Sequence, residues 1–299
     1  MKIFALGDTH LSFNENIDKP MDVFGYGWEN HTERLEKAWN EVVGEDDYVL
    51  IPGDLSWALK LEEALTDIEW IHNLKGKKII SKGNHDLWWS RINYLNTLYD
   101  DIVFLQNTSY YIREANVVCC ATRGWPYPGA VEYSEHDEKI YRRELIRLRM
   151  GLDDARRQVK EARRQLGDAD EQAEVSGEQC EQTGDSREQC EQTGDSHEQC
   201  GQSEASRTSN AQRQPEDTRI IVALHYPPSD AKCKETEFTK ILEEYGVSDC
   251  VYGHLHGAVA FESGPRGMYR GVNYSLVSID YLGCKPKLIY DSSANVATK

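Results

Sequence analysis

The sequence of 299 residues lacks the marks of membrane and secreted proteins. No run approaches 18 consecutive apolar residues, so we expect no helix that spans a membrane. The apolar run at the start of the chain is too short for the core of a secretory signal, and no small-residue cleavage site follows it. We therefore expect a cytoplasmic protein with no membrane partner.

Paired cysteines and excess basic charge are also missing. The eight cysteines form no C-x-x-C pair, which argues against a zinc ribbon, and without a secretory signal reduced thiols are simpler than a disulfide framework. The 34 Lys and Arg residues face 51 Asp and Glu residues, for a net charge of −17. A chain this acidic with no basic stripe is not expected to bind nucleic acid or an anionic membrane. Nothing in the sequence predicts an oligomeric state.

Short apolar runs bounded by glycine or proline alternate with helical patterns along the chain. Such runs are typical of buried strands, and they cover 2–6, 48–51, 78–80, 102–105, 117–121, 219–224, 250–252, 274–279 and 287–290. Apolar residues recur with helical spacing over 33–43 and 59–74. This alternation predicts a layered α/β domain.

One segment departs from this pattern. A long charged helix is expected over about 135–166, and a repeat of ten residues follows, EQCEQTGDSR at 178–187 with close copies at 188–197 and 198–207. The repeat has no large apolar residues, so stacked copies would bury almost nothing, and its composition is typical of disorder. We therefore expect one domain made of 1–165 and 218–299, interrupted by a disordered low-complexity insertion at 166–217.

Five of the predicted strands end in polar motifs. These are Asp8-Thr9-His10, Gly53-Asp54, Gly83-Asn84-His85-Asp86, His225 and Gly253-His254-Leu255-His256. Each motif alone has a structural explanation as a helix cap, a turn or a buried histidine. Together they hold five of the nine histidines, at the strand ends where open α/β sheets place their sites. Carboxylate, imidazole and amide oxygen are ligands of divalent metals, so the set predicts a metal site, in which Asp54 would bridge two ions about 3.5–4 Å apart.

The ordered set D-x-H, G-D, G-N-H-D, H and G-H-x-H resembles the calcineurin-like metallophosphoesterases. The resemblance covers nearly the whole chain outside the insertion, and 52–57 and 82–89 are similar to a bacterial subgroup of predicted phosphohydrolases. It implies a layered β-sandwich flanked by helices. It also implies a bimetallic phosphohydrolase, which cleaves phosphate mono- or diesters with a two-metal-activated hydroxide.

The resemblance further implies a role for each motif residue. The first metal would be held by Asp8, His10, Asp54 and His256, and the second by Asp54, Asn84, His225 and His254. His85 would face the phosphate and either stabilise the transition state or protonate the leaving oxygen. Asp86 would orient the His85 imidazole, as carboxylates often do for histidine.

The ligand set and the chemistry leave several alternatives. Mn²⁺ or Fe is favoured, and Zn²⁺ or Ni²⁺ also accepts these ligands. The substrate is expected to be a small phosphorylated compound. A metal-dependent hydrolase of a non-phosphate ester or amide, and a non-catalytic binding protein that retains the site, are the competing hypotheses. The asparagine and histidine of G-N-H-D favour phosphate chemistry over the first hypothesis. All expected ligands are present, so the sequence gives no support to a decayed, non-catalytic site.

Residues that select the substrate are marked less clearly. The rings of Trp57, Trp88 and Trp125 can stack on a substrate ring, although a tryptophan beside a strand end usually fills space in the core. Arg123 is a candidate phosphate clamp or else a solvated surface residue. The turn-rich segment 124–129 is a candidate rim of the substrate pocket.

Overall fold

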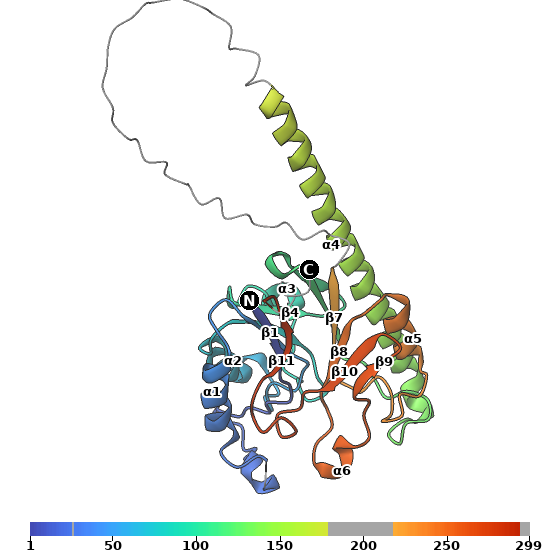
Figure 1. Ribbon diagram of the computed structural model, residues 1–299. Coiled ribbons are helices and arrows are strands. Elements are labelled where there is room, and N and C mark those ends of the chain that lie inside the picture. Colours follow the sequence, from blue (N-terminus) through green and yellow to red (C-terminus); the bar gives the residue numbers. More distant parts are fainter. Residues whose placement is uncertain (26, 179–217, 294–299) are drawn as a thin grey trace, which may run out of the picture.

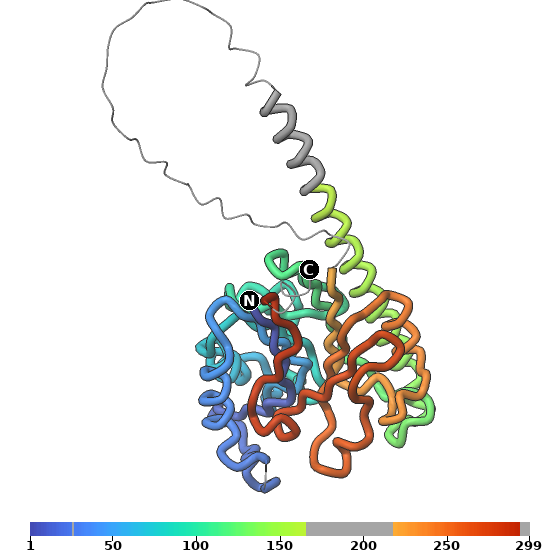
Figure 2. The backbone as a smooth tube through the Cα atoms, viewed as in Figure 1, coloured from blue at the N-terminus to red at the C-terminus, as the bar shows by residue number. Residues whose placement is uncertain are grey.

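The computed structural model describes residues 1–25, 27–178 and 218–293 (Figure 1, Figure 2), and of 166–178 it describes the backbone alone. Two β-sheets pack face to face, and helices cover their outer faces (Figure 1). The first sheet has the order β11 (Lys287–Asp291), β1 (Lys2–Ala5), β2 (Tyr48–Ile51), β3 (Lys77–Ser81) and β4 (Ile102–Leu105). The second has the order β5 (Ser109–Ile112), β6 (Val117–Thr122), β7 (Arg219–Leu224), β8 (Asp249–Tyr252), β10 (Val272–Leu276) and β9 (Gly267–Tyr269).

Parallel strands form the centre of both sheets. β1 to β4 run parallel to one another, as do β6, β7, β8 and β10. The antiparallel strands β11, β5 and β9 lie at sheet edges. Within each sheet the carboxyl ends of the parallel strands therefore meet at one edge, and this is where the sequence places its polar motifs.

The continuous apolar character of the strands has a simple cause, because both faces of each sheet are buried. In β1, Ile3 and Ala5 pack between the sheets, whereas Phe4 packs under the helices on the outer face. The second sheet repeats the pattern, with Ile221 in the layer between the sheets and Val222 under its own helices. Alternate residues of a strand point to opposite faces, so a strand buried on both sides is apolar throughout.

The helices complete a four-layer arrangement. α1 (His31–Val42) and α2 (Leu61–His72) cover the first sheet with Leu35, Trp39, Ile68 and Ile71, which are spaced for one helical face. α4 (Glu138–Glu178) and α5 (Glu237–Glu244) cover the second sheet. Shorter helices are α3 (Ile92–Leu95), α6 (Ala258–Phe261) and three 3₁₀ turns at Met21–Phe24, Arg113–Ala115 and Glu135–Asp137. The predicted layered α/β sandwich is confirmed.

The long charged helix differs from its prediction in length. Its backbone continues to Glu178 in Figure 1, past the end expected near residue 166. The rest of the expected insertion, 179–217 with its decapeptide repeat, lies outside the described residues.

Two further expectations concern cysteine and membranes. Within the described ranges, Cys119, Cys120, Cys233, Cys250 and Cys284 are buried free thiols. The three repeat cysteines lie outside those ranges. No helix in the described part of the chain combines the length and the apolar character that crossing a membrane requires.

Candidate metal centre

The polar motifs of both sheets converge where the two sheets meet. Asp8 and His10 follow β1, Asp54 follows β2, and Asn84 and His85 follow β3; His225 follows β7, and His254 and His256 follow β8. Gly7 joins the sheets at this point, because its N–H donates to the Val277 carbonyl at 2.8 Å and its carbonyl accepts the Ile279 N–H at 3.0 Å. The structure thus brings together all seven predicted metal ligands from opposite halves of the chain.

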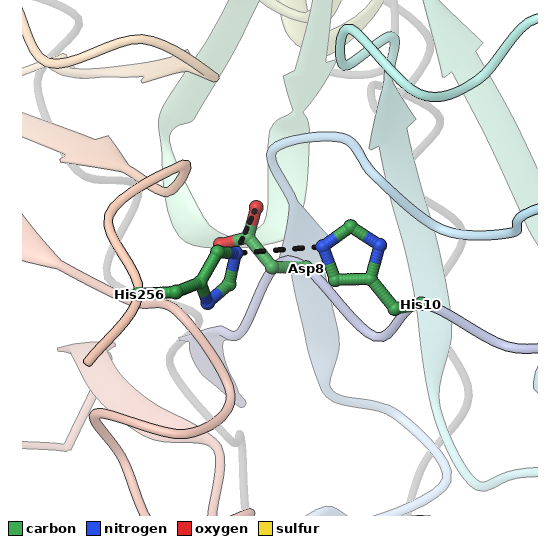
Figure 3. Close-up of side chains that lie close together, drawn as sticks. All are labelled: Asp8, His10 and His256. Atoms are coloured by element: carbon green, nitrogen blue, oxygen red, sulfur yellow. Dashed lines mark hydrogen bonds and ion pairs between the residues drawn. The ribbon is translucent and has the colours of Figure 1, made fainter. Parts of the chain in front are cut away.

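The first group consists of Asp8, His10 and His256 (Figure 3). The Nε2 atoms of the two imidazoles face each other at 3.4 Å, and Asp8 Oδ1 lies 3.9 Å from His256 Nε2. All three residues offer a ligand atom within 4.8 Å of the others. Two ring nitrogens and a carboxylate oxygen aimed at one point form a donor set that fits a divalent cation.

The second group surrounds the side-chain oxygen of Asn84. His225 Nε2 lies 2.6 Å and His254 Nδ1 lies 3.0 Å from Asn84 Oδ1. The other ring nitrogen of His225, Nδ1, lies 3.1 Å from the carbonyl of Pro52 and donates to it, which leaves an unprotonated Nε2 directed at the Asn84 oxygen. Facing lone pairs repel one another, and a cation between them removes the repulsion, so this group also fits a metal.

Asp54 lies between the two groups. Its Oδ2 atom is 3.7 Å from His10 Nε2 and 3.4 Å from His225 Nε2. Its other oxygen, Oδ1, accepts the backbone N–H of His85 at 2.8 Å, which fixes the carboxylate. One carboxylate oxygen thus borders on both groups, as a bridging ligand does.

Burial sets the protonation of this cluster. Burial raises the pKa of Asp54 well above its usual value, and the nearby Asp86 and Asp8 carboxylates raise it further. Burial also lowers the pKa of His10 and of His225 well below the usual value for histidine. The imidazoles of His10 and His225 are therefore neutral, as ligation requires, and a cation would supply the positive charge that the buried carboxylates lack.

The backbone at the strand ends is held in an uncommon conformation. Asp8, His10, Asp54 and His254 all have positive φ, at 58°, 46°, 52° and 71°. Non-glycine residues in this region cost about 1–3 kcal/mol each and cluster at functional sites. Here the left-handed turns direct the side chains away from the strands and toward the space between the two sheets.

Two motif glycines leave room for the carboxylates. A Cβ atom on Gly83 would lie 2.1 Å from Asp54 Oδ1, and one on Gly253 would lie 2.4 Å from Asp8 Oδ2. Any other residue at either position displaces a carboxylate. The glycines of G-N-H-D and G-H-x-H are thus required by close approach to the candidate ligands.

His85 lies at the rim of the cluster. Its ring centroid is 5.7 Å from that of His10 and 4.3 Å from that of Trp57, and the ring has no hydrogen-bond partner among the described residues. Burial lowers its pKa, and His254, His256 and Lys19 lower it further. A half-buried imidazole whose nitrogens have no hydrogen-bond partner among the described residues is available to a substrate.

The prediction that Asp86 orients His85 is wrong. Asp86 is fully buried, and its carboxylate accepts the backbone N–H groups of Asp54, Leu55, Ser56 and Gly83 and the indole N–H of Trp88, at 2.7–3.3 Å. Five donors use up its acceptor sites, so Asp86 instead fixes the two loops that carry Asp54 and Asn84. The Asp86 carboxylate therefore makes no hydrogen bond to the His85 ring among the described residues.

The aromatic candidates have three different positions. Trp57 stacks on His10, with centroids 4.6 Å apart and an interplanar angle of 22°. Trp88 is 2% exposed and holds Asp86, so its expected role in substrate stacking is wrong and it is a core residue. Trp125 donates its indole N–H to Asp137 at 2.9 Å, and the Arg123 guanidinium lies 4.3 Å from its ring. Of these rings, only Trp57 lies directly on the candidate ligands.

Two acidic residues at the site were not predicted. Asp280 Oδ1 lies 2.9 Å from His256 Nδ1, so Asp280 accepts that N–H and directs Nε2 at His10 and Asp8. Glu132 Oε2 lies 3.2 Å from His254 Nε2. Asp280 follows β10, whose carboxyl end lies beside that of β8, so the strand-end rule that found the other residues also applies to it.

A cavity opens beside His254. It has a volume of about 340 Å³ and is lined by residues of the 126–132 loop, by Tyr226 and Pro227, and by Lys234 and Leu255. Loop 124–129 was expected at the rim of the pocket, and its residues Pro126, Tyr127 and Gly129 line this cavity. The space is in the range of small-molecule sites.

These features define a layered α/β fold with a candidate metal centre at the junction of its two sheets. Residues 1–161, more than half of the chain, match the family model of the calcineurin-like phosphoesterases. The chain belongs to this family.

Similar proteins add little detail. The Gene 66 protein of Mycobacterium phage L5 is 41% identical over 58 residues, which are 19% of this chain and 28% of that protein. The Gene 66 protein of phage D29 is 30% identical over 82 residues, 23% of this chain and 41% of that protein. The matches thus span less than half the length of these relatives.

Two solved structures are similar along 96% of this chain and 95% of their own. A protein of unknown function from Aquifex aeolicus has a TM-score of 0.42 at 11% identity. The phosphopantetheinyl hydrolase PptH from Mycobacterium tuberculosis has a TM-score of 0.43 at 15% identity.

Proposed function

We propose that this protein hydrolyses mono- or diesters of small phosphorylated compounds at a centre that holds two divalent ions. The observation that carries the proposal is Asp54 Oδ2, which lies 3.4–3.7 Å from one imidazole of each donor group. Asp8, His10, Asp54 and His256 would hold one ion, and Asp54, Asn84, His225 and His254 the other. Mn²⁺ or Fe is the favoured metal, and Zn²⁺ or Ni²⁺ also fits these donors.

Two divalent ions in these groups would supply positive charge to the phosphoryl group and would make a water molecule more acidic. The chain itself places the groups that surround the phosphate. Asp54 and Asp8 are fixed by backbone N–H donors from His85 and His254. Asp280 and the Pro52 carbonyl fix the rings of His256 and His225. The donor set is therefore organised before a substrate arrives, which is the condition for electrostatic catalysis.

His85 supplies a proton to the leaving oxygen or a hydrogen bond to the phosphoryl group. Its ring has no hydrogen-bond partner among the described residues, and its lowered pKa makes its protonated form a stronger acid than ordinary histidine. Trp57 packs against both His85 and His10, so it holds the imidazole at the rim of the metal groups. The cavity beside His254 would receive the organic part of the substrate.

The test compares His85→Ala with wild-type protein on two monoesters. p-Nitrophenyl phosphate releases a stable anion, whereas β-glycerophosphate releases an alkoxide that needs a proton. We expect kcat to fall about 10²–10⁴-fold on β-glycerophosphate, less on p-nitrophenyl phosphate, and metal content to stay unchanged. An equal loss on both would assign His85 to the phosphoryl oxygens.

His136→Ala is the matched control, because His136 is exposed on the surface. It should keep full activity on both esters. Loss of metal in His85→Ala would contradict the place of His85 outside the ligand set, and undiminished activity would remove it from the mechanism.

A further inference from the structure

A second cavity, of about 190 Å³, lies beside the candidate metal centre. It is enclosed by the carboxyl ends of β3, β4 and β6 and by the first turns of α4. Its polar lining consists of Lys82, Gln106, Thr122, Arg123, Arg143, Glu144 and Arg147. The cavity is smaller than typical sites for whole ligands, so it suits a small group such as a phosphate.

The charge of this basic cavity is opposite to that of the chain. Four cationic side chains and one carboxylate line it, which leaves a net charge of three positive units, in a protein whose net charge is −17. Glu144, the carboxylate, is fully buried, accepts the Thr122 hydroxyl at 2.8 Å and pairs with Arg147 at 2.8 Å and Arg143 at 3.4 Å. Glu144 therefore already has three partners, and among the described residues it forms no ion pair with the other two cations.

Lys82 and Arg123 are the cations without a counterion. Among the described residues, the side chain of Lys82 makes no hydrogen bond or ion pair, and the buried Nε atom of Arg123 has no acceptor. Asp86 lies near Lys82, but its carboxylate is held by five other donors. Like charges that line a cavity repel one another, and their partial burial removes some of their hydration. An anion bound between them offsets both the repulsion and the lost hydration.

The basic cavity shares its walls with the metal centre. Lys82 stands two residues before Asn84 in the same strand-end loop. The carbonyl of Arg123 accepts the backbone N–H groups of His225 and Tyr226, both at 3.0 Å. The cavity therefore borders on the loop that carries Asn84 and on the backbone that carries His225.

We propose that the basic cavity is a second anion site that binds a phosphate group, separate from the one held at the metal centre. Arginine side chains bind phosphate oxygens in pairs, and the three net charges match a dianion better than a single carboxylate. The phosphate is either a second phosphoryl group of the substrate or free inorganic phosphate. This inference deepens the proposed function, but its binding test does not depend on catalysis.

The binding test uses full-length Asp54→Asn protein, in which the metal centre is disabled, and titrates inorganic phosphate into it by calorimetry. We expect one phosphate to bind per chain. Adding Lys82→Gln or Arg147→Gln should weaken that binding about tenfold or more, because each removes a charged hydrogen-bond donor. Adding Arg142→Gln should change nothing, since Arg142 lies on the same helix, is exposed and pairs with Glu138.

The kinetic test distinguishes the two sources of phosphate in metal-loaded protein that carries the native Asp54. If the substrate supplies it, Lys82→Gln and Arg147→Gln raise KM for pyrophosphate or fructose 1,6-bisphosphate and leave KM for p-nitrophenyl phosphate unchanged. If free phosphate supplies it, phosphate inhibits the wild type non-competitively and both variants lose that inhibition.

Circular dichroism and thermal melting show whether the variants are folded. Absence of phosphate binding in folded Asp54→Asn protein, or equal binding in the variants and the Arg142→Gln control, would overturn the inference. Phosphate binding at the basic cavity without any esterase activity would overturn the proposed function alone.

Discussion

Asp280 shows how one side chain directs a candidate ligand. Burial alone would lower the pKa of His256, but the hydrogen bond to Asp280 and the charge of Asp8 outweigh burial and raise it. The same hydrogen bond holds Nδ1 as the donor and leaves Nε2 for the metal. Carboxylates that hold a metal-binding histidine in this way raise its affinity for the metal.

Asp280→Asn should therefore weaken metal binding about 10–100-fold without unfolding the protein. Metal affinity, measured by competition with a chelator of known strength, checks this. The exposed Asp18 provides the control variant Asp18→Asn, for which no change is expected. Equal affinities for the two variants would show that Asp280 has no part in metal binding.

The sequence predicted which residues would form the candidate site where they follow a strand and occur in the order of the motifs. The seven candidate ligands lie together as expected, because parallel strands bring their carboxyl ends to one edge. The directions of neighbouring side chains were not predictable. Asp86 and Trp88 are buried and hydrogen-bonded to each other. The ring of His85, which lies beside Asp86 in the chain, instead packs on Trp57 at the rim of the site. Side-chain directions at the strand ends depend on the left-handed backbone conformation there, which the hydrophobic pattern of the sequence does not predict.

The carboxyl end of α2 depends on a lysine from the next strand. Lys78 in β3 is 1% exposed, and its ammonium group donates to the carbonyls of His72 and Leu74 and to Asp101 Oδ2, at 2.9, 2.5 and 2.6 Å. A cation at this end of a helix satisfies free carbonyls and the helix dipole. Burial would raise the pKa of Asp101, but the hydrogen bonds from Lys78 and His72 outweigh it and lower the pKa.

Asp101→Asn should lower the free energy of unfolding by about 3 kcal/mol at pH 7, because it leaves the Lys78 ammonium buried without its carboxylate. The contribution of Asp101 is present above its ordinary pKa of 3.8 and disappears as pH falls through its lowered folded value. Wild-type and variant stabilities should therefore converge in acid. Urea unfolding of both proteins from pH 7 to below pH 3.8 checks this.

The neighbouring Asp100 is exposed, so Asp100→Asn is the matched control and should stay close to wild type throughout. A constant difference between Asp101→Asn and wild type across this pH range would contradict the assignment, since an effect of packing alone does not titrate.

Elements were predictable where their patterns are strong. All nine expected strands are present within the described residues, and α1 and α2 lie where apolar residues recur with helical spacing. The edge strands β5 and β9 and the helix α5 were not expected. β5 and β9 have three or four residues and only one neighbour each, so tertiary pairing rather than their own sequence creates them. α5 has eight residues, a length at which packing rather than propensity stabilises a helix.

The candidate site exists only when the two sheets are assembled. The first sheet contributes Asp8, His10, Asp54 and Asn84, and the second contributes His225, His254 and His256. A metal that binds this set therefore binds the folded chain and not the unfolded one. Metal binding should stabilise the fold by about 2.7 kcal/mol at a free concentration of 100 times Kd.

Thermal unfolding with and without a chelator measures this linkage. The melting temperature should rise with Mn²⁺ concentration in the wild type. In Asp54→Asn the melting temperature should not change with Mn²⁺ concentration, because the substitution removes the carboxylate that lies between the two donor groups. A melting temperature that does not respond to metal in the wild type would contradict the coupling of site and fold.

We propose that one chain holds two ions and that both serve hydrolysis. The most direct measurement is the metal content of stripped and Mn²⁺-restored protein by mass spectrometry, with p-nitrophenyl phosphate and bis-p-nitrophenyl phosphate turnover on the same samples. The exposed Asp46 provides the control variant Asp46→Asn. We predict two ions per chain and metal-dependent turnover of at least one ester in wild type and Asp46→Asn, with both lost in Asp54→Asn. Absence of bound metal in the restored wild-type protein would contradict the account.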